Sequence, residues 1–91
     1  MGLRQSFHFK HLSREDVRAF LRQQFVGVAA LDDRTDFFVF AQLPGRSPFT
    51  FDCELVQEGI RSDRAGEYFW FLGTFIEALT AYFGPVEVAD I

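Results

Sequence analysis

The chain has 91 residues, of which 48% are hydrophobic and 24% are charged, and its formal net charge is −4. This length fits a single α+β domain over residues 1–91, and the composition excludes a disordered, collagen-like or coiled-coil protein. The acidic balance disfavours nucleic acid and anionic membranes as partners, because phosphate binding needs clustered lysine and arginine. The single cysteine excludes an internal disulfide framework and favours a reducing, cytoplasmic location.

The first half of the chain predicts a strand, a helix and a hairpin. Alternating phenylalanines predict a strand over Ser6–Lys10. Ser13 is a good N-cap, and apolar residues at three- and four-residue spacing predict a helix over Arg14–Gln24. The apolar runs Val28–Leu31 and Phe37–Ala41 flank an acidic connection, which predicts two paired strands.

The second half predicts a strand, a loop, a long helix and a final strand. Apolar and polar residues alternate over Phe49–Leu55, the clearest strand pattern in the sequence. The polar segment Gln57–Ala65 contains a glycine and predicts a loop. Apolar residues at helical spacing predict a helix over Arg64–Phe83, ended by Gly84–Pro85. A short strand over Val86–Asp90 closes the chain.

These elements predict a two-layer α+β fold with an antiparallel β-sheet meander and two helices. The element order is β-α-β-β-β-α-β, and the sequence leaves open how the first and last strands pair. The second helix is expected to pack on the sheet through Leu72, Phe75 and Leu79, which lie on one apolar stripe at about 100° per residue.

Two apolar surfaces are left over once this core is assigned. Trp70 lies opposite the apolar stripe of the second helix, on the same side as Thr74 and Glu77. Three interpretations of Trp70 are open. Glu67 or a loop covers it, it lies half exposed at the surface, or a partner protein contacts it. Phe37 and Val39 lie on the second face of their strand, which either the first helix or another copy of the chain covers. A chain this small has difficulty covering both surfaces, so we expect a homodimer that buries one of them.

The residues that carry catalytic or metal chemistry do not form a recognisable pattern. Cys53 falls on the inward face of its strand, where a thiol is an inert packing group. His8 and His11 lie on opposite faces of an extended chain, so they do not converge on a metal. Arg61 and Arg64 flank the expected start of the second helix and are predicted to be solvated. We therefore predict no catalytic residue, no metal and no cofactor.

These features predict a small non-catalytic protein-interaction or regulatory module that forms a homodimer and has a possible protein partner of unknown identity. The alternative is a small-ligand-binding protein or enzyme with an aromatic-lined pocket between helix and sheet. The central order α-β-β-β-α is also that of double-stranded-RNA-binding domains, but an acidic chain without a lysine cluster disfavours that function.

Overall fold

The computed structural model describes residues 3–91 and confirms the predicted α+β fold. Within these residues, two helices accompany a six-stranded antiparallel sheet of order β2-β3-β4-β5-β1-β6. The elements in chain order are β1 (Leu3–His8), α1 (Arg14–Gln23), β2 (Ala30–Asp33), β3 (Phe37–Ala41), β4 (Phe49–Val56), β5 (Gly59–Gly66), α2 (Phe69–Phe83) and β6 (Glu87–Asp90).

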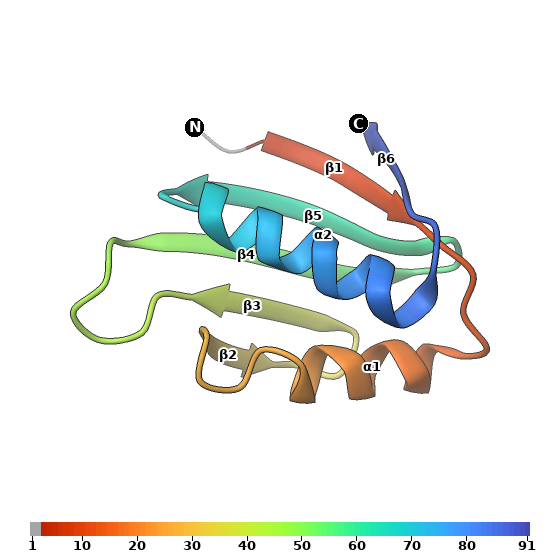
Figure 1. Ribbon diagram of the computed structural model, residues 1–91, viewed down its shortest axis with the longest axis horizontal. Coiled ribbons are helices and arrows are strands. Elements are labelled where there is room, and N and C mark those ends of the chain that lie inside the picture. The colour runs from red at the N-terminus through yellow and green to blue at the C-terminus, as the bar shows by residue number, and fades with distance from the viewer. Residues whose placement is uncertain (1–2) are drawn as a thin grey trace.

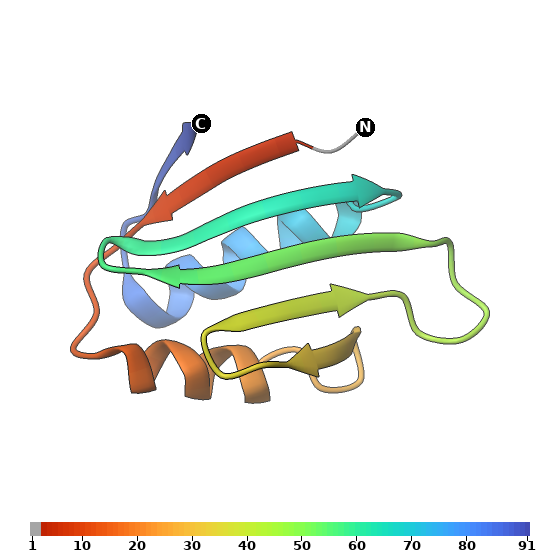
Figure 2. The same cartoon turned by 180° about the vertical axis from the view of Figure 1, so that it is seen from behind.

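Both helices lie on the same face of the sheet. In Figure 1, α2 crosses in front of the middle strands and α1 lies beside β2 and β3, whereas Figure 2 shows the opposite face of the sheet with no helix over it. The ring of Phe25, which follows α1, contacts Phe40 of β3 and Phe75 of α2, with centroid distances of 5.2 and 5.5 Å. The idea that each helix covers a different face is therefore wrong.

Local sequence signals explain the elements that form this core. Ser13 caps α1, with its Oγ accepting a hydrogen bond from the Asp16 N–H at 3.3 Å. The alternation in β4 turns its apolar side chains inward, so Phe51 and Cys53 are fully buried and the predicted register is confirmed. The meander β2-β3-β4 is also as predicted.

Helix α2 buries most of its predicted apolar stripe. Phe71, Phe75 and Leu79 are fully buried against the sheet. Tyr82, which the helical spacing also places on the stripe, is 59% exposed. Its ring packs on Phe20 of α1 at 5.2 Å and leaves its other side in solvent.

Strand β5 (Gly59–Gly66) occupies most of the segment 57–65 that was predicted to be a loop, and α2 begins at Phe69 rather than at Arg64. Two of the three inward positions of β5 are polar, Ser62 and Arg64, so the strand has no apolar alternation. Gly66 then turns the chain into α2 with φ +79°, and a Cβ there would lie 2.5 Å from the carbonyl oxygen of Pro48. Glycine is therefore required at this turn.

The structure also corrects the limits and pairings of the shorter strands. β1 begins at Leu3 and ends at His8, and it lies between β5 and β6, so the first and last strands are neighbours. Asp32 and Asp33, expected as turn residues, belong to β2. Asp33 faces α1 and accepts a hydrogen bond from the Arg22 Nε at 2.6 Å.

The packing of α2 predicts a contrast between two phenylalanines of the same helix. Phe75→Ala should lower the free energy of unfolding by about 3–5 kcal/mol, because it leaves a cavity between helix and sheet. Phe69→Ala should cost the folded monomer less than about 1 kcal/mol, since Phe69 is 72% exposed. Urea denaturation of both variants measures this difference, and equal losses would contradict the packing described here.

Candidate functional site

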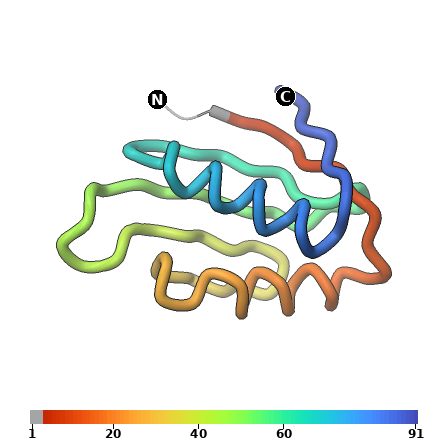
Figure 3. The backbone as a smooth tube through the Cα atoms, in the orientation of Figure 1, coloured from red at the N-terminus to blue at the C-terminus, as the bar shows by residue number. Residues whose placement is uncertain are grey.

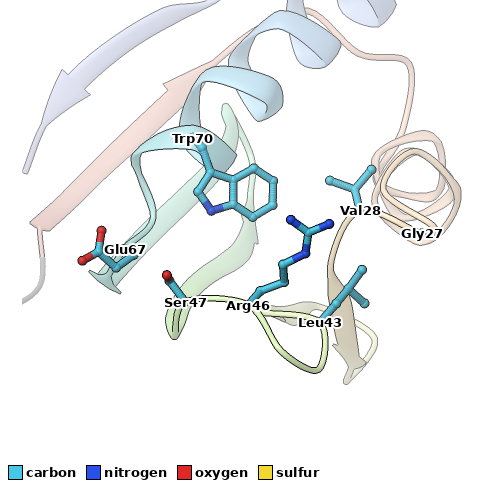
Figure 4. A pocket seen from close by; sticks show the side chains of 7 residues that line it. All are labelled: Gly27, Val28, Leu43, Arg46, Ser47, Glu67 and Trp70. Carbon is cyan, nitrogen blue, oxygen red and sulfur yellow. The ribbon is translucent and has the colours of Figure 1, made fainter.

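A groove beside Trp70, here called the Trp70 groove, lies at the end of the molecule where α2 begins. Figure 3 shows the start of α2, the β3–β4 connection (42–48) and the α1–β2 connection (24–29) lying toward this same end. The groove has a volume of about 430 Å³, within the range of pockets that hold small ligands. Its lining residues are Gly27, Val28, Leu43, Arg46, Ser47, Glu67 and Trp70 (Figure 4).

Backbone and ring contacts hold Trp70 in the groove. The Glu67 N–H donates to the Pro48 carbonyl at 2.9 Å, which fastens the start of α2 to the β3–β4 connection. The indole ring meets the buried Phe49 edge-on, with centroids 5.4 Å apart and an interplanar angle of 82°. Trp70 remains 47% exposed. Half exposure was one of the alternatives that the sequence left open for Trp70, and a partner contact at its free side stays a prediction.

Two charged side chains lie at opposite sides of the groove. Figure 4 shows the Arg46 guanidinium extending toward Trp70 and the Glu67 carboxylate pointing away from it. Neither side chain forms an ion pair with another residue of the described range 3–91. Arg46 is therefore available to bind a carboxylate or another anion that enters the groove.

The outward side of α2, here called the α2 face, continues from this groove along the helix. All of its residues are exposed: Phe69, Trp70, Gly73, Thr74, Glu77, Thr80 and Ala81. Glu77 is the only charged residue among the fifteen of α2. The Thr74 hydroxyl donates to the Trp70 carbonyl at 3.1 Å, so this polar group is hydrogen-bonded within the helix. An exposed helix face normally carries several charges, so the α2 face is unusually apolar.

The other predicted surface, Phe37 and Val39, lies on the opposite side of the sheet. This open sheet face is the one seen in Figure 2. Phe37 is 37% exposed and Val39 is half-buried. The same face carries charged residues on β4, β5 and β1, with Arg4 of β1 bound to Asp63 of β5 at 3.0 Å. An antiparallel sheet can face water on one side, and these charges suit that role.

The five predicted interaction residues therefore separate into two sets. Trp70, Thr74 and Glu77 lie together on the α2 face, while Phe37 and Val39 lie across the sheet from them. The sequence did not reveal the groove beside Trp70, because its lining comes from three segments far apart in the chain. The one sequence signal near the groove was the pair Pro44–Gly45, which predicts a turn but does not predict which residues the turn contacts.

Sequence reasoning also missed the burial of Arg64. This residue was expected to be solvated, yet it is 1% exposed on the inward side of β5. Its Nη2 donates to Gln5 Oε1, and its guanidinium lies over the rings of Phe51 and Tyr68 at 5.6 and 5.1 Å. Burial lowers the pKa of Arg64, while Tyr68 and Asp90 act in the opposite direction. The aromatic rings and Gln5 hold the cation, and no carboxylate of the described residues forms an ion pair with it.

The thiol and the two imidazoles lie apart from one another. Cys53 is fully buried on the inward side of β4, and this burial, followed by the nearby Asp52 charge, raises the pKa of the thiol well above its ordinary value. His8 lies on the outward side of β1, 3.9 Å from Glu87, and His11 Nδ1 lies 3.2 Å from the Phe9 carbonyl oxygen. Over residues 3–91 no three metal-ligating side chains form a cluster.

Comparison with known proteins gives no relative. No protein-family model matches the chain, and neither a curated protein nor a solved structure matches it significantly. Neither of the helices described within residues 3–91 has both the length and the apolar character needed to cross a membrane.

Two carboxylates give opposite predictions for the pH dependence of stability. Burial, and then repulsion by Asp63, raises the pKa of Asp52, so its ionisation destabilises the fold. Asp52→Asn should therefore increase stability at pH 7, and the gain should vanish as the pH falls below the ordinary aspartate pKa of about 4, where the carboxyl is protonated in both the native and the unfolded state.

Asp33 is the matched control, because a hydrogen bond from Arg22, followed by one from the Thr35 N–H, lowers its pKa. Its ionised form contributes stability that is lost as the pH falls through the native pKa. Asp33→Asn should therefore lower stability at pH 7. Thermal unfolding from pH 3 to 7 tests both variants, and shifts of the same sign at pH 7 would contradict this assignment.

The burial of Cys53 predicts an unreactive thiol and a structural role. A thiol reagent should label the native protein only as fast as it unfolds, because the reactive thiolate is disfavoured in the core. Cys53→Ser should cost about 1–3 kcal/mol, since it places a hydroxyl group in an apolar site. Rapid labelling under native conditions, or a serine variant of unchanged stability, would show that Cys53 is not a packing residue.

Proposed function

We propose that the protein is a small non-catalytic interaction module that works as a homodimer and uses the α2 face as its contact surface. The observation that carries this proposal is the exposed side of α2, which presents Phe69 and Trp70 and a single charge, Glu77. A helix that is apolar on nearly all sides is normally buried on all sides by other parts of the protein or by a partner. Tryptophan is also enriched among the residues that dominate binding energy at interfaces.

The distribution of charge supports the α2 face over the open sheet face. Two copies of a chain with net charge −4 repel each other, and the repulsion is smallest where each presents few carboxylates. The open sheet face presents Asp52, Glu54 and Asp63, and Arg61 and Arg4 pair with the last two of them. Asp52 has no such partner, and its pKa is already raised by burial and by Asp63. Burying the open sheet face in a dimer would therefore cost more free energy than burying the α2 face.

A non-catalytic role is supported by the separation of the reactive groups. The Cys53 thiol faces the core, whereas His8 lies on the opposite side of the sheet. A nucleophile and its base need to lie within hydrogen-bond distance of each other. We also place the protein in the cytoplasm, on the ground that its one cysteine suits a reducing compartment.

The second candidate function is binding of a small ligand, and the Trp70 groove is the observation that favours it. The space between α2 and the sheet is filled by packed rings such as Phe51 and Phe75, 4.8 Å apart, so an interior pocket is not the site. The groove combines an aromatic surface with the free cation of Arg46. Binding of a small aromatic carboxylate with loss of affinity in Arg46→Ala would favour this function.

Gly73 gives a test of the dimer that does not depend on damaging the fold. A Cβ at Gly73 would meet no atom within 4 Å, so a larger residue fits the monomer. Gly73→Ala should stabilise the helix by about 0.5–1 kcal/mol. Gly73→Arg should keep the fold and convert the dimer to a monomer, because its side chain occupies the contact surface. Sedimentation velocity measures the assembly.

Phe37→Glu is the control on the open sheet face and should remain dimeric. A wild-type protein that stays monomeric at high micromolar concentration would overturn the proposal. If Phe37→Glu dissociates the dimer while Gly73→Arg leaves it intact, the protein assembles through the open sheet face instead.

A further inference from the structure

The α2 face carries one free charge, Glu77, and the Trp70 groove carries two, Arg46 beside Trp70 and Glu67, whose carboxylate points away from Trp70 (Figure 4). Glu77 on α2 and Arg46 in the β3–β4 connection each lack an ion pair within residues 3–91. Trp70 and Glu77 are two helical turns apart and therefore point to the same side of α2. The Arg46 side chain, from the β3–β4 connection, extends through the groove toward Trp70 (Figure 4).

We propose that Glu77 of one copy enters the Trp70 groove of the other and binds Arg46, in an antiparallel contact of two α2 helices centred beside Gly73. In a two-fold symmetric contact, residue i of one copy meets residue j of the other, and the reverse pair forms as well. A two-fold axis between positions 73 and 74 places each Glu77 opposite the Trp70 of the second copy. This inference rests on the proposed homodimer.

Gly73 is the position at which the two helices approach most closely. Glycine within a helix costs about 0.5–1 kcal/mol relative to alanine, and nothing in the described chain uses the space that it leaves. Packed helices lie 8–10 Å apart, with the shorter distances at small residues. The approach of a second helix accounts for this glycine, because a side chain there would hold the helices apart.

The surroundings of Trp70 suit a carboxylate from outside the chain. The N-cap residue of α2, Tyr68, makes no side-chain capping hydrogen bond, and the first turn contains no acidic residue. The N–H groups of that turn therefore keep their attraction for a negative charge. Arg46 adds a full positive charge beside them.

The size of a standard interface also favours a contact that includes Arg46. Such an interface involves about 20–30 residues per partner, which is more than one helix supplies. The β3–β4 connection, which carries Arg46, lies beside α2 and would supply part of the remainder.

Charge reversal tests the pair in the full-length protein. Glu77→Arg and Arg46→Glu should each raise the dimer Kd about tenfold or more, and the double variant should recover most of the affinity. Glu77→Arg changes the net charge from −4 to −2, which by itself reduces repulsion between copies. Weaker association in this variant would therefore reflect the lost contact. The double variant has the wild-type net charge.

Glu54→Arg, on the open sheet face, is the matched control and should leave the Kd unchanged or lower it. Equilibrium sedimentation gives the Kd of each variant. If Gly73→Arg dissociates the dimer while both charge reversals leave its Kd unchanged, the proposed dimer stands and the Glu77–Arg46 pair is wrong. If the double variant is weaker than both single variants, the pairing is likewise wrong. A monomeric wild-type protein overturns the dimer and the pair together.

Discussion

The packing of both helices against one face of the sheet is the constraint on which the other features depend. The Phe71 and Phe75 rings interlock with those of β3 and β4, including Phe51, which fixes α2 over the middle of the sheet. Since α1 lies beside α2 on the same face, no element among residues 3–91 lies over the outer side of α2 (Figures 1 and 2). That side carries Glu77 as its only charge, so the arrangement that completes the core also leaves an apolar helix face in solvent.

The sequence predicted the elements whose inward side chains are all apolar. Alternation identified β4, and helical spacing identified the inner side of α2 together with the outward position of Trp70. β5 was missed because its inward residues Ser62 and Arg64 are polar, and a strand with such residues has no period-two apolar pattern. Arg64 is buried through Gln5 and Tyr68, contacts that only the folded sheet brings together.

The candidate site was predictable only in part, for a related reason. Helical geometry alone places Trp70, Thr74 and Glu77 on one side of α2. The groove beside them depends on where the β3–β4 connection lies, and that is set by long-range contacts, such as the hydrogen bond between Glu67 and Pro48. Local propensities carry no information on such contacts, so Arg46 was not recognisable as a site residue before the fold was known.

A symmetric crosslink tests the proposed assembly most directly. In the proposed antiparallel contact the two copies of Thr74 would lie next to the two-fold axis, where their Cα atoms would come within the distance of about 4.4–6.8 Å that a disulfide spans. Thr74→Cys should therefore form a disulfide-linked dimer under mild oxidation, since the native Cys53 is buried and does not compete. Thr80→Cys, an exposed threonine on the same face but farther from the axis, should not. Equal crosslinking at both positions, or none at Thr74→Cys, would contradict the account.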